Sequence, residues 1–343
     1  MDTPKKQPPT DDILERLTDP DVLAGLLDGM EQKTQNIDAA ALAAGIKSRV
    51  IGQDGVADDV AKQIRHRFAR GDRTKPIGVF CFAGPPGVGK SYYAQVLAEK
   101  LYGSQQALQF FDMNMFSDAH AASALFGVAK GYVGFGTYGT LTRGLRDYPK
   151  SVILLDEFEK ADSAVHKKFL TAWNNGFVTE TSDGQKISTT DAIFILTVNA
   201  AADQIGQLAK TYANDRDKLV KTSKAALKEA GFAPEVLDRI DHVFAFRPLE
   251  GLDIAKVVGL EIESIIAGHK LELSKGGIDP NILARYIQRS KENEIGLRRL
   301  TKVIEDEIAE TLIQARQNGA KSIRLLDSPD GICAEIATYH QKP

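Results

Sequence analysis

Cysteine is scarce in this sequence, which contains only two in 343 residues, Cys81 and Cys333. Two cysteines do not make the disulfide framework of a small secreted domain, and a reducing interior suits them better. Cys81 falls within an apolar run and is predicted to be a small buried residue. Long apolar runs are lacking as well: residues 1–10 are polar, and no later segment approaches a membrane-spanning length. We therefore expect a cytoplasmic protein with no membrane partner.

The charge balance also lacks a dominant sign. The formal net charge is −3 and the isoelectric point is about 6.1, so the chain has no general attraction to nucleic acid or anionic surfaces. We expect no nucleic-acid partner, and a nucleic-acid motor is the least favoured of the functions considered. The length is sufficient for two domains, one sizeable and one small.

The most informative motif is GPPGVGKS at residues 84–91, which follows the pattern G-x-x-x-x-G-K-[ST] of a phosphate-binding loop. Its glycines allow backbone N–H groups to surround a phosphate, while Lys90 places a charge on the β and γ oxygens and Ser91 ligates Mg²⁺. The apolar residues 77–83 before it predict a buried strand. The apolar spacing after it predicts a helix that starts at Lys90 and points its positive end at the phosphate.

A second apolar strand is predicted at residues 151–155, and it runs directly into Asp156 and Glu157. Four hydrophobic residues followed by two acids make the complementary half of a nucleotide site. Asp156 would hold Mg²⁺, directly or through water, and Glu157 would polarise the attacking water. The alternative is a phosphate loop on some other nucleotide binder, with an unrelated acidic strand end.

The order of predicted elements indicates an α/β fold. Strands and helices alternate from about residue 38 to residue 249, which is typical of a parallel sheet covered by helices on both faces. Five strands are expected, near residues 77–83, 109–115, 152–155, 192–198 and 242–246. After Pro248 the pattern becomes helical, with helices expected at residues 253–269, 280–290 and 297–317 and a candidate strand at 322–326.

These patterns divide the chain into three parts. Residues 1–45 are expected to be an extension, partly disordered, with two short amphipathic helices between about residues 11 and 33 that either cap the main domain or dock elsewhere. Residues 46–249 are expected to form the nucleotide-binding α/β domain, and residues 250–343 a small, mainly helical lid. Trp173, on a predicted helix after the acidic strand, is expected to lie in the core.

The order of the motifs resembles the AAA+ module of the Clp chaperone-unfoldases, specifically the second, C-terminal module of the disaggregase branch. The likeness covers about residues 48–326. It starts with RVIGQ at 49–53, similar to the family's segment beside the adenine, and continues through the phosphate loop to GYVGF at 131–135, similar to its pore loop. SVILLDEFEK at 151–160 is close to the acidic-strand signature. Asn199 matches the polar sensor, residues 234–241 resemble the arginine-finger segment, and residues 296–298 match the lid's sensor arginine.

The resemblance implies a set of site residues for ATP and Mg²⁺. Those implied to bind the nucleotide are Val50, Ile51, Gly84, Pro85, Pro86, Gly87, Val88, Gly89, Lys90, Ser91 and Tyr92. Those implied to act in catalysis are Lys90, Glu157, Asn199, Arg239 and Arg298, with Ser91 and Asp156 holding Mg²⁺ and with Tyr132 and Val133 contacting the substrate.

Three of these residues also have a physical interpretation of their own. Asn199 closes an apolar run and can help to orient the attacking water, or it is a strand-end asparagine that makes a turn. Arg239 precedes the fifth strand at the domain surface, where it can reach a neighbouring subunit's γ-phosphate or form a weak salt bridge with Asp238 or Asp241. Arg298, at the start of the lid helix, can couple hydrolysis to lid rotation.

Two function classes follow from the loop at residues 130–136, KGYVGFG, in which glycines flank an exposed aromatic residue. In the leading hypothesis the chain forms a homo-oligomeric ring, a hexamer, that threads a protein client past Tyr132. In the alternative, the chain is a non-threading assembly or scaffold ATPase, such as a loader or a secretion-apparatus component, which needs the nucleotide site but not Tyr132. The loop itself could also be structural, with Tyr132 packed on its own domain. Residues 177–185 look like the family's second pore loop, with weaker identity.

A peptidase partner is not expected. Peptidase-coupled members of the family carry an exposed aliphatic-Gly-aromatic or aliphatic-Gly-Leu tripeptide after the polar sensor. The nearest stretch here, IGQL at residues 205–208, breaks that pattern. The resemblance therefore implies no docking to a barrel peptidase.

Overall fold

The computed structural model describes residues 37–70, 73–118, 121–131, 136–292, 297–329 and 331–336. The two helices expected between residues 11 and 33 lie outside the described residues. The helices and strands of the larger domain are α3 (Ala39–Lys47), α4 (Asp54–Phe68), β1 (Gly78–Ala83), α5 (Lys90–Tyr102), β2 (Leu108–Asp112), α6 (Ala122–Phe126), α7 (Thr140–Asp147), β3 (Val152–Asp156), α8 (Ser163–Asn175), β4 (Phe177–Thr179), β5 (Lys186–Ser188), β6 (Ile193–Val198), α9 (Ala202–Thr211), α10 (Arg216–Glu229), α11 (Pro234–Leu237) and β7 (His242–Ala245).

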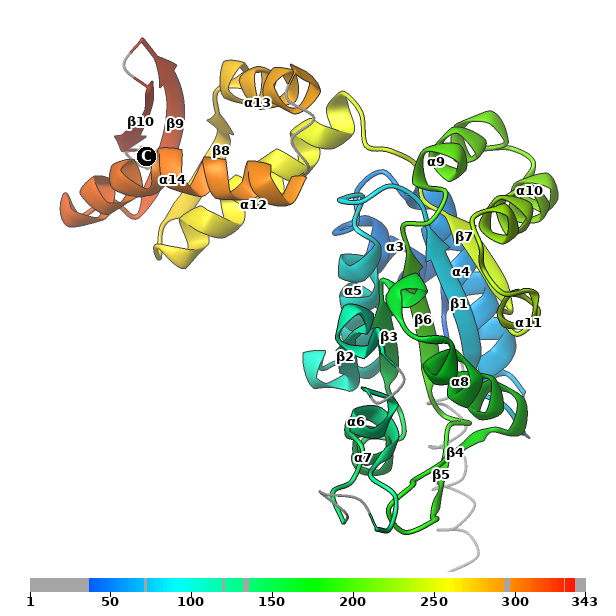
Figure 1. Ribbon diagram of the computed structural model, residues 1–343. Helices are drawn as coiled ribbons and strands as arrows, with labels where there is room; N and C mark the ends of the chain where they lie inside the picture. The colour runs from blue at the N-terminus through cyan, green and yellow to red at the C-terminus, as the bar shows by residue number, and fades with distance from the viewer. Residues whose placement is uncertain are drawn as a thin grey trace, which may run out of the picture.

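The five strands expected from the sequence form one sheet in the order β2-β3-β6-β1-β7, and each neighbouring pair is parallel (Figure 1). The expected α/β fold with a five-stranded parallel sheet is therefore confirmed. The second strand ends earlier than expected, at Asp112, because the chain turns there into a short 3₁₀ helix, and the Asp112 side chain accepts a hydrogen bond from the backbone of Asn114.

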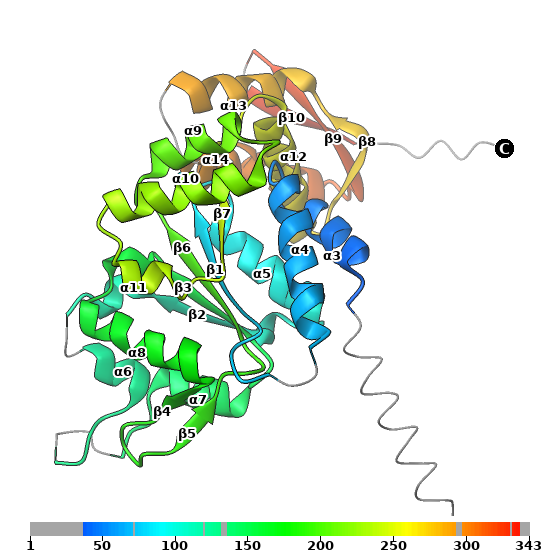
Figure 2. The ribbon, with the colours of Figure 1, turned by 90° about the vertical axis from the view of Figure 1, so that its right-hand side faces the viewer.

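Helices cover both faces of this sheet, as the fully buried β1 requires (Figure 2). Phe80 and Phe82 pack with α3, α4 and α5 on one face. Val79, Cys81 and Ala83 pack with α8 to α11 on the other face, where Trp173 is also buried. The predictions that Cys81 and Trp173 belong to the core are confirmed.

The parallel register brings the carboxyl ends of the central strands to one edge of the sheet. Ala83 at the end of β1 pairs with Val198 at the end of β6, and Leu155 of β3 pairs with Leu196 of β6. The segments that leave these strands are the phosphate loop, the Asp156–Glu157 pair and Asn199. Open parallel sheets bind their ligands at this edge, and the three sequence motifs meet there.

A second unit follows β7 and contains three helices, α12 (Leu252–Gly268), α13 (Pro280–Glu292) and α14 (Leu297–Gln317) (Figure 1). The helix expected at residues 297–317 is α14, and its Leu300, Ile304, Ile308 and Leu312 are buried. The helix ends before Gly319, whose φ of +78° is the conformation that favours glycine there.

The lid also contains a three-stranded sheet, which was predicted only in part. The candidate strand is β9 (Ser322–Ser328), and it lies between β8 (Glu272–Ile278) and β10 (Gly331–Ile336). β8 was not predicted because its sequence, ELSKGGI, is polar and has two adjacent glycines. The sheet completes the lid core, since Ile323, Leu325 and Ile332 are buried against the three helices.

The proposed domain division remains a prediction. Helix α3 crosses the expected boundary at residue 45, and its Leu42, Ala43 and Ile46 are buried in the same cluster as Phe80 and Phe82. Among the described residues, no helix has the length and apolar character that crossing a membrane requires.

Candidate nucleotide-binding site

The phosphate loop links β1 to α5 through glycines that other residues could not replace without strain. Gly84, Gly87 and Gly89 have φ values of +146°, +75° and +92°. A Cβ atom on Gly84 would lie 2.5 Å from the carbonyl oxygen of Phe246, so the loop also needs glycine for close approach. Gly89 caps α5 without a side-chain hydrogen bond, which leaves the first N–H groups of the helix for a phosphate.

Lys90 is held inside the loop that it belongs to. Its Nζ donates to the carbonyl oxygens of Gly84 and Pro85, both at 2.7 Å, and to Asn199 Oδ1 at 2.8 Å. The side chain is only 6% exposed. Burial lowers the pKa of Lys90 to about 8, although the nearby carboxylates of Glu159 and Asp156 act in the opposite direction. A bound phosphate anion would therefore stabilise the charged ammonium form of Lys90 and raise its pKa.

Nucleotide binding is expected to weaken, and to take up a proton, as the pH rises above 8. The ammonium form is the one that attracts phosphate, and with a pKa of about 8 in the free protein its population falls about tenfold per further pH unit. Calorimetric titration with ATP at about pH 8.5, in two buffers of different ionisation enthalpy, measures the proton uptake. The same titration at about pH 7 is the control, because Lys90 is then already charged. Equal binding enthalpies in both buffers at the higher pH would contradict this assignment.

Ser91 and Asp156 come together as the sequence predicted. Ser91 Oγ donates to Asp156 Oδ1 at 2.6 Å, and the same oxygen accepts from Thr197 Oγ1 at 2.6 Å. A hydroxyl and a carboxylate at one strand end are hard oxygen donors of the kind that Mg²⁺ uses together with substrate phosphates. Within the described ranges no cluster of three or more His, Cys, Asp or Glu side chains could hold a metal. Ser91 and Asp156 fit a Mg²⁺ ion that arrives with the nucleotide.

Glu157 occupies an unusual backbone conformation next to this pair. Its φ and ψ of 55° and 50° lie in the left-handed region, which costs energy for a residue other than glycine. The Glu157 N–H donates to Thr197 Oγ1 at 3.0 Å, so a buried threonine on the neighbouring strand holds the strained turn. Thr197 was not predicted, although a polar residue inside the apolar strand β6 is a signal that could have identified it.

Two amides hold the Glu157 carboxylate. Asn199 Nδ2 donates to Oε1 at 3.2 Å, and Asn114 Nδ2 donates to Oε2 at 2.8 Å. Asn199 thus touches both Lys90 and Glu157, as expected of a polar residue between the phosphate loop and the acidic strand. Its backbone N–H donates to Glu159 Oε1 at 2.8 Å, so Glu159 fixes its position. Neither Asn114 nor Glu159 was predicted, because Asn114 follows an edge strand and Glu159 is one of several acids in its segment.

The segment at residues 49–53 lies against the phosphate loop. Val50 is buried, and its Cγ1 would be 3.8 Å from a Cβ atom on Gly89. Ile51 is half-buried, whereas Tyr92 and Pro86 are exposed. The Tyr92 hydroxyl accepts a hydrogen bond from Arg49 Nε at 3.1 Å.

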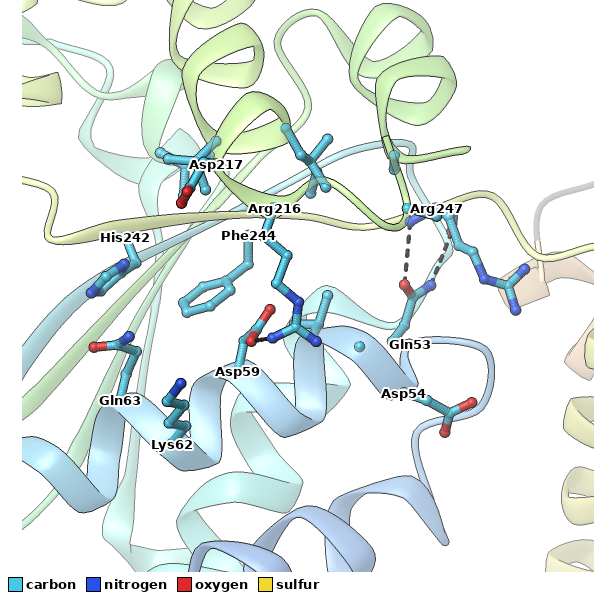
Figure 3. Close-up of a pocket in the computed structure, with 18 of the residues that line it drawn as sticks. Gln53, Asp54, Asp59, Lys62, Gln63, Arg216, Asp217, His242, Phe244 and Arg247 are labelled. Atoms are coloured by element: carbon cyan, nitrogen blue, oxygen red, sulfur yellow. Dashed lines mark hydrogen bonds and ion pairs between the residues drawn. The ribbon is translucent and has the colours of Figure 1, made fainter. Parts of the chain in front are cut away.

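Gln53 connects this segment to the strand that leads into the lid. Its side chain donates to the carbonyl oxygen of Arg247 at 2.9 Å and accepts from the Arg247 N–H at 3.2 Å (Figure 3). The guanidinium of Arg247 forms an ion pair with Asp253, in the first turn of α12, at 2.6 Å. The Gln53 amide therefore holds the backbone of Arg247, and the Arg247 side chain contacts the first turn of the lid helix α12.

A cavity of about 450 Å³ lies beyond Gln53, between α4, α10 and β7. Figure 3 shows Lys62 and Asp59 of α4 facing His242 and Phe244 of β7, with an ion pair between Asp59 and Arg216 of α10. None of its described lining residues belongs to the phosphate loop. The cavity is separate from the place where the predicted phosphate contacts meet.

Arg239 is exposed and lies away from the other predicted catalytic residues. Within the described residues its side chain has no ion pair, and the proposed salt bridge to Asp241 is replaced by one from Arg67 at 2.8 Å. Asp241 N–H donates to the carbonyl oxygen of Val79, which places Arg239 near the amino end of β1. Gly84 is five residues further along, roughly 16 Å at the rise of an extended strand.

Three predicted residues cannot be placed fully. Tyr132 and Val133 lie outside the described residues. The backbone of Arg298 lies in the first turn of α14, but its side chain is outside the described part of the chain.

Comparisons with known proteins agree with the fold. A family model described as AAA domain (Cdc48 subfamily) matches residues 75–243, and one described as Torsin matches residues 26–121. The chain is 32% identical over 303 residues to chaperone protein ClpB of Chlamydia trachomatis, covering 85% of this chain and 34% of that protein. It is 34% identical over 305 residues to chaperone protein ClpB 2 of Parasynechococcus marenigrum, covering 86% and 33%.

A third relative is the ATP-dependent Clp protease ATP-binding subunit ClpC of Staphylococcus saprophyticus, 31% identical over 300 residues, which cover 82% of this chain and 35% of the relative. The chain thus spans about a third of the length of the curated relatives it matches. The chain belongs to the Clp family of nucleotide-binding AAA+ ATPases.

Proposed function

We propose that this chain hydrolyses ATP at the interface between subunits of a homo-hexameric ring and uses the cycle to pull a protein client through the central pore. Lys90 binds the β and γ phosphates, Ser91 and Asp156 hold Mg²⁺, and Glu157 activates the attacking water, oriented by Asn199. The Mg²⁺ ion supplies charge neutralisation on the phosphates. Lys90, Asn199 and Glu157 are hydrogen-bonded to one another in sequence, and Thr197 connects them to the pair of Ser91 and Asp156, which supports these roles.

The position of Arg239 is the observation that carries the subunit interface. It is exposed, without an ion pair among the described residues, and near the amino end of the sheet, whereas the phosphate loop is at the carboxyl end. A separation of roughly 16 Å along the strands is more than an arginine side chain spans. An exposed arginine that cannot reach its own nucleotide supports a role at the nucleotide of a neighbouring subunit.

The lid carries the second part of this proposal. Residues 246–251 connect β7 to α12, and Gly251 has a φ of 51°, so the connection contains a residue that suits a bend. We propose that residues 250–343 rotate on this connection when Arg298 senses the γ-phosphate. The two hydrogen bonds between the Gln53 side chain and the Arg247 backbone hold one end of this connection in place, which supports a hinge.

The packing of residues 205–208 supports the absence of a barrel peptidase partner. These residues lie in helix α9 rather than in an exposed loop, and Ile205 is fully buried. A Cβ atom on Gly206 would lie 3.1 Å from Pro85 and 3.3 Å from Pro248, so this glycine packs closely against the phosphate loop. Cys81 and Cys333 are free cysteines, which supports a reducing, cytoplasmic location.

Tyr132→Ala is the experiment that separates threading from the alternative of a non-threading assembly ATPase. Threading predicts that the variant hydrolyses ATP close to the wild-type rate but no longer unfolds a fluorescent test protein. The control is Tyr148→Ala, because Tyr148 is also an exposed aromatic residue and follows α7. Unchanged unfolding by the Tyr132 variant would contradict threading and favour the scaffold function.

A further inference from the structure

Away from the nucleotide site, one buried carboxylate joins two segments that are far apart in the sequence. Glu180 follows strand β4 and is 0% exposed. Its Oε2 accepts from the Gly139 N–H at 3.0 Å and contacts the Thr142 hydroxyl, which is within hydrogen-bonding distance. Its Oε1 accepts from Ser182 twice, from the N–H at 2.9 Å and from the hydroxyl at 2.7 Å. One oxygen thus serves the start of α7 and the other serves its own hairpin.

Gly127 and Gly139 leave room for the Glu180 carboxylate, because a side chain at either position would clash. A Cβ atom on Gly127 would lie only 1.6 Å from Glu180 Oε1, and Gly127 has a φ of +89°. A Cβ atom on Gly139 would lie 2.1 Å from the carbonyl oxygen of Leu125 and 2.5 Å from the Gly127 nitrogen. The backbones of Gly127 and Gly139 therefore lie close together, and the Glu180 carboxylate packs against both.

Further contacts cross between the same two segments. The Thr181 N–H donates to the carbonyl oxygen of Phe126 at 2.7 Å, and the Tyr138 hydroxyl hydrogen-bonds to Asp183. On the α7 side, the guanidinium of Arg146 lies 4.5 Å from the centre of the Tyr138 ring, so this tyrosine is also held by its own segment. Figures 1 and 2 both show the hairpin β4–β5 beside α6 and α7, at the end of the domain remote from the lid.

Glu180 is ionised at neutral pH. Burial alone would raise its pKa, but the hydrogen bonds from Thr142, Ser182 and Gly139 outweigh burial and lower the pKa below its ordinary value. The carboxylate also lies at the N-terminus of α7, where Gly139 has no side chain to cap the helix, and the helix dipole favours a negative charge. The contact is thus a set of charge-assisted hydrogen bonds.

Both segments are connected directly to the acidic strand. Helix α7 precedes β3, which ends at Asp156, and α8 follows it and leads into the hairpin. Glu157 therefore lies, in the sequence, between the two segments that Glu180 joins. Glu180 is the buried side chain that contacts both segments.

We propose that Glu180 is a positioning residue for client processing, which makes residues 126–131 and 136–142 move as one unit with the hairpin loop 180–185 during the ATP cycle. The inference rests on the proposed threading function, because these are the segments whose sequences resemble the two pore loops of the family. Glu180 itself touches neither nucleotide nor client. Its role is to transmit movement between the two segments.

The test compares Glu180→Gln with a matched pair at its partner, Thr142→Val and Thr142→Ser. The valine removes the hydroxyl at nearly constant shape, and the serine restores it. Glu229→Gln, at an exposed position on α10, is the control for the same chemical change. ATPase rate, unfolding of a fluorescent test protein per ATP hydrolysed, and hydrogen exchange at the Gly139 and Ser182 amides are measured for each.

We expect Glu180→Gln and Thr142→Val to keep the ATPase rate within about twofold and to unfold about tenfold less client per ATP. Thr142→Ser and Glu229→Gln should behave like the wild type. Amide exchange at Gly139 should be faster in the first two variants only. Normal client unfolding per ATP by Glu180→Gln, or an equal loss in both Thr142 variants, would overturn the role of Glu180.

A failure of threading itself gives a different result. If the wild-type ring hydrolyses ATP but unfolds no test protein, the proposed function fails, and the exchange measurement alone decides on Glu180. In that case faster exchange at Gly139 in Glu180→Gln supports a unit joined by the carboxylate. Unchanged exchange at both amides overturns it.

Discussion

Replacing Glu157 with glutamine is expected to reduce ATP turnover by about 10²–10⁴ while ATP still binds, because glutamine keeps the shape of the side chain but cannot accept a proton from water. The phosphate loop and the pair of Ser91 and Asp156 are untouched by the change. The variant should therefore hold ATP and Mg²⁺ for long periods. Turnover is measured by phosphate release, and binding by equilibrium titration with a fluorescent ATP analogue.

A matched comparison for this prediction lies two residues further along. Glu159 accepts a hydrogen bond from the backbone of Asn199, and an amide oxygen can accept the same bond. Glu159→Gln should thus lose less than about tenfold in turnover, the size of effect expected from one altered hydrogen bond. Turnover by Glu157→Gln at the wild-type rate would show that the activating base lies elsewhere. Equal losses in both variants would point to a general effect of charge.

The same variant tests assembly. Light scattering of Glu157→Gln with and without ATP and Mg²⁺ measures its mass while the nucleotide is retained. A shift to about six subunits on adding ATP would support the ring, since a head-to-tail interface gives a fixed number of subunits only when the assembly closes on itself. A monomer or dimer under both conditions would leave Arg239 without a neighbour and favour the scaffold function.

The large domain was predictable because its signals are local and strong. Each central strand is a short apolar run, and a sheet buried on both faces needs such strands. The lid strands β8 and β10 were not predictable in this way. Their sequences are polar or contain glycine, and they become strands by pairing with β9 and covering the lid helices.

The site residues also divide into those that the sequence predicts and those that depend on which strands become neighbours. Lys90, Ser91, Asp156 and Asn199 follow from motif spacing and from the rule that parallel strands end at one edge. Thr197 and Asn114 could not be assigned, because their importance depends on which strands become neighbours. β6 pairs with β3 although β4, β5 and α8 lie between them in the sequence. Only that pairing brings the Thr197 hydroxyl to Asp156 and to the backbone of Glu157.

A role for Arg239 could be argued only from the sequence and the structure together. The sequence placed it just before the fifth strand, and two interpretations of its role remained. The structure shows that Asp241 is occupied by Arg67 and by the N–H of Val79, at 2.8 Å each. The salt bridge to Asp241 that would have explained Arg239 without a function is therefore not formed. What remains is an exposed cation whose proposed partner belongs to another subunit.

Arg239→Ala is expected to reduce ATP turnover by about 10³–10⁵ if the arginine completes the neighbouring site, the range found for arginine fingers in phosphoryl transfer. ATP binding to the altered subunit should change little, because Arg239 is remote from its own phosphate loop. Arg65→Ala is the control, since Arg65 is another exposed arginine, on α4. It should turn over ATP at the wild-type rate.

Mixing two inactive variants then distinguishes action within a subunit from action between subunits. A Glu157→Gln subunit retains Arg239, and an Arg239→Ala subunit retains Glu157, so an interface that combines them in the right order is complete. In randomly mixed rings with equal amounts of each variant, about a quarter of the interfaces have that order. The mixture should therefore regain turnover that neither variant has alone, up to about a quarter of the wild-type rate if the sites act independently. If mixed rings form and no turnover returns, Arg239 does not act across the interface, and its exposed position needs another explanation.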